Sequence, residues 1–321
     1  MTITSIYQPI EQSLAMVEEN LRTFTRANLP WMTEPLKHVL EGGGKRIRPA
    51  LTLLAGKFYR HNPEQLVTIA TAFELFHTAT LVHDDAVDDS AMRRGRPTVN
   101  SRWGDGIAVL LGDYLFSNSA YLVYTVGNLR VIKLFSETLI IISSGQLRQL
   151  FSAYDWRQTQ QDYYEQISSK TASLFAAATQ AGALLSEAPE EAVQALYTYG
   201  RDLGMAFQIV DDILDFVGDE EEMGKPVGSD LLEGTITLPA ILLMENYPQD
   251  NPIKELFQKG RDRNEMQRVI EMVRNSSIVE ECYRIAADFS ARSCRALDGL
   301  PDNAYRRSLL DLAHYLIERR R

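Results

Sequence analysis

The sequence predicts an all-α protein, and three observations carry this prediction. Apolar residues recur at helical spacing along most of the chain, and only 139–142 could be mistaken for a strand. Two acidic motifs with the same spacing each end an apolar helical stretch. Glycine and proline separate the helical segments. At 321 residues and 45% hydrophobic, the chain can bury a sizeable core, and length alone permits one large domain or two.

Charge, cysteine content and hydropathy exclude several classes of protein. With 33 basic and 43 acidic residues the net charge is -10, which argues against a general nucleic-acid binder. The cysteines, Cys282 and Cys294, lack a CxxC arrangement and indicate reduced thiols in a cytoplasmic protein. The N-terminus lacks both the basic region and the apolar region of a secretory signal. No stretch of 18 residues is purely apolar. We therefore expect no transmembrane segment.

The first ordered elements are a peripheral helix over 10–25 and a second helix over 33–40. Three glycines at 42–44 break the second helix and leave backbone amides accessible to an anion. Three cations follow at once: Lys45, Arg46 and Arg48. Pro49 suits the first residue of the next helix. This is not a P-loop, and the pattern favours a phosphate-binding corner over a solvated basic turn.

The first acidic motif ends a buried helix expected over 64–89. Its carboxylates stand at i, i+1 and i+4: Asp84, Asp85 and Asp88. His77 lies about 20° from Asp84 on the helical wheel, so it shares their face. Gly95 and Pro97 should end this helix, and a group of guanidinium side chains follows the motif: Arg93, Arg94 and Arg96. Guanidinium groups there can pair with the carboxylates or bind phosphate oxygens bidentately.

The second acidic motif ends a helix expected over 193–216, and Gln208 lies one turn before it. Its carboxylates repeat the first spacing: Asp211, Asp212 and Asp215. Clustered carboxylates at the ends of apolar helices need a cation, and oxygen-only ligands suit Mg²⁺ bound together with substrate phosphates. One such motif could be a solvated helix end. Two with the same spacing favour a shared metal site.

The remaining segments are also read as helices. Segments 107–122 and 131–150 read as largely buried helices, and Lys170 interrupts an Ala- and Ser-rich helical face, where it either snorkels to solvent or reaches a diphosphate. A polar loop after the second motif presents Lys225 as a lid would.

Several motifs together resemble the trans-isoprenyl diphosphate synthases: GGGKRIRP, HTATLVHDDAVDDSAMRRGRPT, LGDYLFSNS, SSKTASLF, FQIVDDILDF and GKPVGSD. The resemblance implies a single all-α domain over 1–321, with a peripheral N-terminal helix (1–30), C-terminal helices (240–321) and a central cavity between the two DDxxD helices. It also implies a homodimer. The expected reaction condenses an allylic prenyl diphosphate with isopentenyl diphosphate, using three Mg²⁺ ions.

The resemblance also assigns roles to residues of this chain. The metal ligands would be the six motif aspartates. Contacts to the allylic diphosphate would come from Arg93, Lys170 and Lys225, and isopentenyl diphosphate would be held by Lys45, Arg48, His77 and Arg94. Thr171 and Gln208 would stabilise the allylic cation through their oxygen dipoles. No protein residue need act as the final base, because the released diphosphate can accept the proton. Many relatives carry a lysine within EGKxTLP, where this chain has Thr235, so lid closure is less well supported.

Product length is expected to depend on the residues before the first motif. Relatives with short products carry a bulky aromatic at the fifth position before the first aspartate, which is Ala79 here. On an ideal wheel Thr80 lies about 40° from Asp84 and Ala79 about 140°, so the role of Ala79 rests on the resemblance. Phe76 is either a deeper floor or ordinary core. The loop is most similar to solanesyl-type enzymes, which favours a long-chain product, solanesyl (C45), for quinone side chains.

Three alternatives stay open at this stage. A geranylgeranyl diphosphate synthase would use the same site for a shorter product. A class I terpene cyclase or head-to-head synthase shares the ionising chemistry but usually lacks the second DDxxD motif and the basic residues at 45–48. A non-catalytic partner subunit of a prenyl synthase tends to lose an aspartate motif, and this chain retains both.

Overall fold

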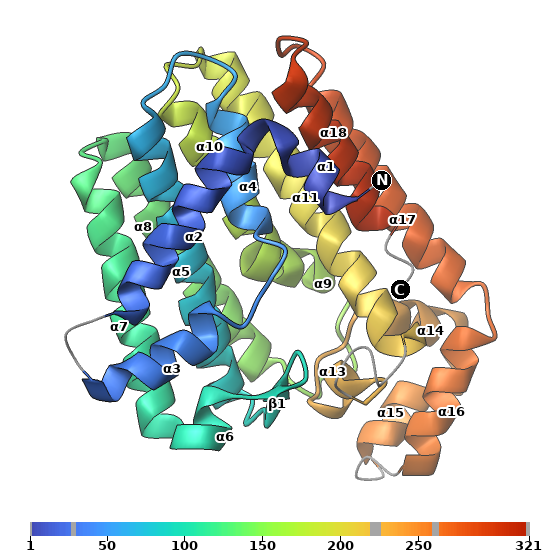
Figure 1. Cartoon of the computed structure of the whole chain (residues 1–321). Coiled ribbons are helices and arrows are strands. Elements are labelled where there is room, and N and C mark those ends of the chain that lie inside the picture. Colours follow the sequence, from blue (N-terminus) through green and yellow to red (C-terminus); the bar gives the residue numbers. More distant parts are fainter. Residues whose placement is uncertain (1, 27–29, 219–225, 259–262, 319–321) are drawn as a thin grey trace.

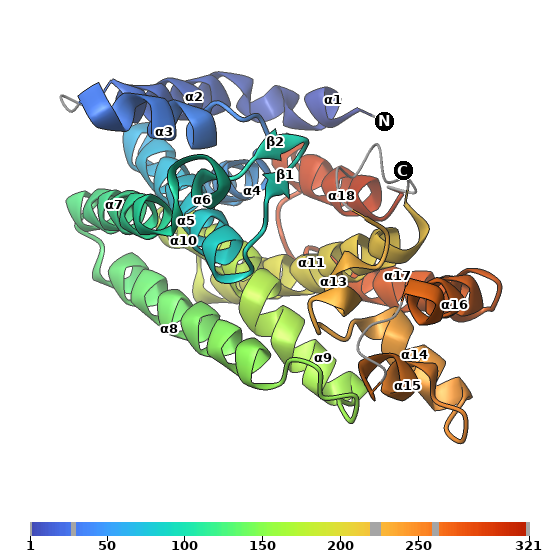
Figure 2. The same ribbon diagram turned by 90° about the horizontal axis from the view of Figure 1, so that it is seen from below.

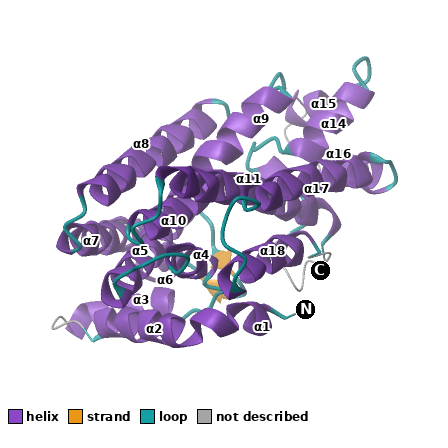
Figure 3. Cartoon of the chain, turned by 90° about the horizontal axis from the view of Figure 1, so that it is seen from above, coloured by secondary structure: helices purple, strands orange, loops and turns teal. Residues whose placement is uncertain are grey.

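The computed structural model describes residues 2–26, 30–218, 226–258 and 263–318, and these residues are almost entirely helical (Figures 1 and 3). Within those ranges the non-helical regular structure is one antiparallel hairpin of two short strands, β1 (Met92–Arg93) and β2 (Arg96–Pro97). The expected all-α class is confirmed. The run 139–142, which resembled a strand, lies inside a helix.

The helices of the first part of the chain are α1 (Ile3–Tyr7), the short 3-10 helix η1 (Gln8–Ile10), α2 (Glu11–Thr25), α3 (Pro30–Leu40), α4 (Ile47–Gly56), α5 (Pro63–Val87), α6 (Val99–Trp103), α7 (Asp105–Thr125) and α8 (Leu129–Phe151). Those of the second part are α9 (Gln160–Ile167), the π-helical segment η2 (Ser168–Ala172), α10 (Ser173–Leu184), α11 (Glu190–Val217), α13 (Ser229–Leu232), α14 (Leu238–Asn246), α15 (Pro252–Gln258), α16 (Arg263–Arg274), α17 (Ile278–Ala296) and α18 (Ala304–Ile317).

Local sequence signals explain where several helices begin. The side chain of Asn62 accepts hydrogen bonds from the first turn of α5, and Asn128 does the same for α8. Thr159 forms a capping box with Asp162 at the start of α9. Pro49 is the third residue of α4 and not its first, as we had expected. A proline is tolerated there because the N–H groups of the first turn have no intrahelical partner.

The helices are arranged in layers. Figure 2 shows α1–α3 along one side of the molecule and α8 and α9 along the opposite side, with α4, α5, α10 and α11 between them. α10 approaches its neighbours closely because small residues face them. A Cβ on Gly182 would lie 2.3 Å from the carbonyl oxygen of Thr52 in α4, and one on Gly204 of α11 would lie 2.6 Å from the Cα of Ala172. Close helix packing therefore brings η2 directly against α11.

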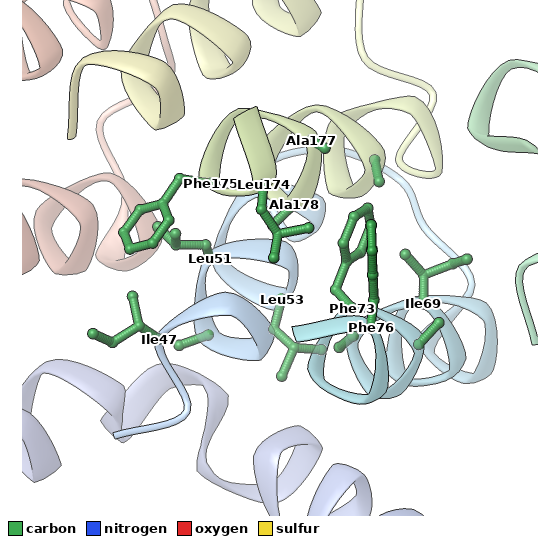
Figure 4. Close-up of a cluster of buried hydrophobic side chains, with 14 of the residues drawn as sticks. Ile47, Leu51, Leu53, Ile69, Phe73, Phe76, Leu174, Phe175, Ala177 and Ala178 are labelled. Atoms are coloured by element: carbon green, nitrogen blue, oxygen red, sulfur yellow. The ribbon is translucent and has the colours of Figure 1, made fainter. Parts of the chain in front are cut away.

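Two hydrophobic clusters form the core. The larger cluster joins α4, α5 and the start of α10, where Leu51, Phe73 and Phe175 face a common interior (Figure 4). The second cluster surrounds the later part of α11 and α14–α17. α11 contributes to both, with Leu203 in the first and Ile209 in the second. The helix that carries the second acidic motif is therefore held along most of its length by buried side chains.

The helix that carries the first motif ends earlier than we had expected. α5 ends at Val87, and the N–H of Asp88 closes it by donating to the carbonyl oxygen of Asp84 (2.8 Å). Gly95 and Pro97 therefore do not end the helix. They belong to the hairpin, which turns through Arg94 (φ 50°) and Gly95 (φ 72°) in the left-handed region. The turn folds the arginine-rich segment back toward the carboxylates.

The expectation that segments 107–122 and 131–150 are largely buried was wrong. α7 and α8 form one edge of the molecule (Figures 1 and 2) and expose many large apolar side chains. The most exposed are Leu110, Tyr121, Tyr124, Leu129, Ile140 and Phe151. Apolar periodicity identifies a helix but does not say which apolar face a neighbour covers.

Within the part of the chain that the structure describes, two helices, α5 and α7, are long and apolar enough to cross a membrane by length and composition. The most apolar window of α5 is 72% buried inside the fold, as in the core helix of a soluble protein, whereas that of α7 is 33% buried. If the chain has no transmembrane segment, as expected from the sequence, the exposed apolar side chains of α7 need another explanation.

Candidate active site

The first acidic motif is partly buried where α5 meets the hairpin. Asp85 is 5% exposed and accepts a hydrogen bond from Nε of Arg93 at 2.7 Å. Burial raises the pKa of Asp85 and of Asp88; the positive charges of Arg93 and, at Asp88, Lys170 oppose this effect, and repulsion from Asp84 adds to it. The raised pKa values show that burial disfavours the charged form of these carboxylates more than the neighbouring cations favour it, and that repulsion within the cluster adds to this effect. A cation bound there would relieve that repulsion.

The second acidic motif is held by hydrogen bonds from other segments. Asp212 accepts from the hydroxyl of Tyr163 (2.6 Å) and from Nε2 of Gln208 (2.8 Å). Burial raises the pKa of Asp212 well above its usual range. Asp215 accepts from the hydroxyl of Ser229 at 2.9 Å, so the GSD part of the loop motif packs onto the end of the second motif.

The π-helical segment η2 links the two motifs. Its Lys170 places Nζ 3.9 Å from Oδ2 of Asp84 in the first motif. The neighbouring Thr171 donates its hydroxyl to Oε1 of Gln208 at 2.6 Å, and Gln208 in turn holds Asp212. A π-bulge offsets successive side chains, so adjacent residues can serve two different partners. The two acidic motifs therefore face the same region, joined by a continuous path of contacts.

The carboxylates divide into two groups by exposure. Three are buried: Asp85, Asp212 and Asp215. The other three are partly exposed: Asp84, Asp88 and Asp211. In the described ranges no three acidic, His or Cys side chains converge on a single point. The donors here are all carboxylate oxygens, which fits a hard divalent cation that keeps part of its shell from water or substrate. The residues therefore fit such an ion.

A group of basic side chains that includes Arg48 and Arg94, with His77, lies beside these motifs. Arg48 stacks over the ring of Phe175, 5.0 Å from its centroid, and its buried Nε has no hydrogen-bond partner. Burial lowers the pKa of Arg48 to about 10. Burial and then Arg48 and Arg94 lower the pKa of His77 well below its usual range, so the imidazole is neutral at pH 7. An unsatisfied buried guanidinium donor among other cations fits an anionic ligand. Lys45 is exposed at the rim, with its ammonium group 5.5 Å from the ring centroid of Tyr315.

One of the three cations after the glycine turn has a structural partner instead. Arg46 forms ion pairs with Glu18 of α2 (2.6 Å) and Glu74 of α5 (2.8 Å). It thereby ties the glycine turn to two helices. Arg94 donates to the carbonyl oxygen of Gly43 at 3.0 Å, which joins the hairpin to the same turn.

The residues predicted to limit product length lie on the inner side of α5. Ala79 and Phe76 are fully buried, and Thr80 is partly exposed. The ring of Phe76 packs at 5.3 Å from Phe116 of α7 and 5.0 Å from Phe135 of α8, centroid to centroid. Phe76 therefore belongs to an aromatic cluster about two turns below the first motif.

Sequence reasoning missed several residues of this region. Tyr163, Ser229 and Gln149 all hold site residues, and none stands in a spacing pattern with its partner. Only Ser229 carried a signal, because it follows Gly228 within the loop motif. Lys225 lies outside the described residues.

Comparisons with known proteins agree with this arrangement. Residues 29–273 match the family described as Polyprenyl synthetase. The chain is 39% identical to heptaprenyl diphosphate synthase component 2 of Geobacillus stearothermophilus, with 99% of each chain covered. It is 35% identical to octaprenyl diphosphate synthase of Escherichia coli, with full coverage of both chains. It is 36% identical to the geranyl-diphosphate-specific all-trans-nonaprenyl-diphosphate synthase of Rhodobacter capsulatus, over 98% of this chain and 97% of that one.

Solved structures give the same result. A decaprenyl diphosphate synthase from Rhodobacter capsulatus superposes with a TM-score of 0.93 at 36% identity over the whole of both chains. A polyprenyl synthase from Caulobacter crescentus, complexed with calcium and isoprenyl diphosphate, gives a TM-score of 0.95 at 31% identity, over 100% of this chain and 98% of that one.

The fold and the two acidic motifs thus define an all-helical enzyme with the isoprenoid synthase fold. Enzymes of this class transfer prenyl groups and use divalent metal ions. The chain belongs to the polyprenyl synthetase family and is a long-chain trans-polyprenyl diphosphate synthase.

Proposed function

We propose that the protein extends an allylic diphosphate, farnesyl or geranylgeranyl diphosphate, with successive isopentenyl diphosphates to solanesyl diphosphate (C45), a precursor of quinone side chains. One observation carries the assignment of the reaction to this site. The path from Asp84 through Lys170, Thr171 and Gln208 joins the two acidic motifs beside a group of basic side chains. A diphosphate between them would meet carboxylate-bound cations and ammonium and guanidinium groups together.

Within this proposal the six motif aspartates bind three Mg²⁺ ions. The partly exposed Asp84, Asp88 and Asp211 are the more accessible ligands, and the three buried aspartates complete the ligand set from the inner side of the cluster. Bound Mg²⁺ supplies positive charge for the departing allylic diphosphate. Lys170, Arg93 and Lys225 bind the same diphosphate. The oxygen atoms of Thr171 and Gln208 stabilise the allylic cation through their dipoles.

Isopentenyl diphosphate would bind to the basic side chains of Lys45, Arg48 and Arg94 together with His77. The buried Nε of Arg48 lacks a partner, and the phosphate oxygens of the substrate would satisfy it. The imidazole of His77 has one N–H group that can donate a hydrogen bond to a phosphate oxygen. The cations come from the turn after α3, the start of α4 and the hairpin, all brought together by the Arg94–Gly43 hydrogen bond.

Product length follows from the space beneath the allylic site. A small side chain at Ala79 leaves room for the growing chain, and the cluster of Phe76, Phe116 and Phe135 would form the floor. The relatives carry the names of heptaprenyl, octaprenyl and nonaprenyl enzymes, so the long-chain class is common to them. The test is product chromatography with farnesyl and geranylgeranyl diphosphate as separate primers. A dominant C45 product supports the proposal, and a C20 product would favour the geranylgeranyl alternative.

We further propose that the exposed face of α7 and α8 pairs with a second copy of the chain. The face presents Leu110, Leu129 and Phe151 at 66%, 79% and 90% exposure. The exposed ion pair Lys133–Glu137 lies on α8. Charged side chains suit the polar rim of a protein interface and not a surface in contact with lipid tails. With this face covered, the chain would need no membrane and would act in the cytoplasm as one domain per protomer.

Oligomeric state tests this face directly. In sedimentation velocity the wild type should be a dimer, and Leu129→Asp should shift it toward the monomer. Met16→Asp, on exposed α2, is the matched control and should leave the dimer intact. A monomeric wild type would contradict the proposal. Activity of the purified chain alone, with Mg²⁺ and both diphosphates, separates a catalytic homodimer from a non-catalytic partner subunit.

A further inference from the structure

Gln149 on α8 contacts two segments of the site at once. Its Nε2 donates to the hydroxyl oxygen of Thr235 at 3.1 Å. Its Oε1 accepts a hydrogen bond from Nζ of Lys170, also at 3.1 Å. The two partners are 86 and 21 residues away in the chain, and the side chain of Gln149 is partly buried between them. This amide therefore joins the end of α8, η2 and the segment after the second acidic motif.

Close packing fixes α8 against η2 at this level. A Cβ on Gly145, one turn before Gln149, would lie 2.6 Å from Cβ of Ser169. Only a glycine allows the two backbones to approach so closely. Because Ser169 is next to Lys170, the approach brings the Gln149 amide within hydrogen-bond reach of the ammonium group.

The other partner is also held firmly. The N–H of Tyr154 donates to the carbonyl oxygen of Gly234 (3.0 Å), and the N–H of Thr235 donates to that of Asp230 (2.8 Å). The ring of Tyr154 would lie 2.8 Å from a Cβ on Gly234, whose φ is 87°. The hydroxyl of Thr235 is thus presented to Gln149 from a backbone with little freedom to move.

The chemistry of the two partners sets the direction of the amide. A threonine hydroxyl can accept a hydrogen bond, whereas an ammonium group can only donate. With Nε2 committed to Thr235, the oxygen of Gln149 must face Lys170. A lysine at 235 could only donate, and the amide would have to turn its oxygen toward that lysine and away from Lys170.

We propose that Gln149, oriented by Thr235, is a positioning residue that holds the Lys170 ammonium group beside Asp84, ready for the allylic diphosphate. This inference rests on the proposed role of Lys170. Lysine has a long flexible stem and Lys170 is 31% exposed, so without Gln149 its ammonium group would swing toward solvent. The hydroxyl at position 235 thus has a specific task, although it replaces a possible phosphate contact.

The experiment compares Gln149→Met, Thr235→Val and the double variant. Residues that orient a functional group typically change affinity or activity by about 10–100-fold when removed. Gln149→Met should therefore lower kcat/KM for the allylic diphosphate by roughly tenfold or more. The same variant should bind an unreactive allylic thiodiphosphate more weakly, with a higher Kd. Its KM for isopentenyl diphosphate should change less than about twofold. Thr235→Val should show a smaller effect in the same direction. Thr235→Ser, which keeps the hydroxyl group, should retain wild-type values.

Because both residues act on one ammonium group, the double variant should be no worse than Gln149→Met alone. Gln161→Met, which removes an exposed amide on neighbouring α9, is the matched control and should change nothing. The inference would be overturned if the losses of the two single variants multiplied in the double variant. A Thr235→Ser variant as impaired as Thr235→Val would also overturn it. If Gln149→Met fails to fold, the comparison of Thr235→Val with Thr235→Ser still tests the inference. A wild type that does not elongate at all would refute the proposed reaction, while thiodiphosphate binding would still test Gln149.

Discussion

Replacing Lys170 with methionine removes one positive charge from the middle of the site and keeps the length of the side chain. At an effective dielectric constant of about 20, unit charges 3.9 Å apart interact by roughly 4 kcal/mol. The side chains of Lys170 and Asp84 are 31% and 21% exposed, so solvent screening reduces this interaction energy to about 1.5–3 kcal/mol. A diphosphate in place of Asp84 carries at least the same charge. We therefore expect Lys170→Met to lower kcat/KM for the allylic substrate by roughly 10–100-fold.

The assay is steady-state incorporation of labelled isopentenyl diphosphate with the allylic primer varied. Lys170→Arg keeps the charge and should retain more activity than Lys170→Met. Lys37→Met, at an exposed position of α3, is the matched control for a lost lysine charge. It should leave kcat/KM unchanged. An equally active Lys170→Met enzyme, or a loss as large in the Lys37 variant, would refute the electrostatic reasoning.

Three further changes test other parts of the structure. Ala79→Tyr puts a bulky ring on the inner side of α5, where Ala79 is 0% exposed, and should shorten the product on reversed-phase chromatography; an unchanged product would remove Ala79 from the chain-length argument. Arg46→Met leaves Glu74, 7% exposed, without its ion pair and should cost about 3–5 kcal/mol in urea unfolding, whereas a loss under about 1 kcal/mol would contradict a structural role. The pKa of His77 is lowered in the folded protein, so at this residue only the unfolded chain takes up a proton as the pH falls below about 6.5, and His77 should contribute a loss of roughly 1 kcal/mol of stability per pH unit there. His77→Gln should abolish that part of the acid dependence, and an identical pH profile would show that His77 titrates equally in both states.

Much of the fold and part of the site could be predicted from local patterns. The helix of the second motif was expected over 193–216 and is found at Glu190–Val217, and the expected helix 10–25 is found at Glu11–Thr25. Both are defined by apolar periodicity within one segment. The end of α5 was misplaced, because the hairpin that follows it is held by a long-range contact between Arg94 and the glycine turn at 42–44.

Burial was predicted less well than helicity. The apolar residues of α7 and α8 look alike in sequence whether a neighbour covers them or not, and the structure leaves Leu129 and Phe151 on the surface. Among the cations after the glycines, Arg46 and Arg48 are two residues apart with similar chemistry. Tertiary packing gives Arg46 two carboxylate partners and leaves Nε of Arg48 without one.

By itself the sequence determined the helical class, the two acidic motifs and the cations that accompany them, because helix periodicity and motif spacing are local properties. Only the tertiary structure decided which aspartates are buried and which are accessible. It also placed Gln149 between Lys170 and Thr235, the latter 86 residues away. Such partners are chosen by how helices pack, and a one-dimensional pattern holds no information on the distance between segments that pack against each other.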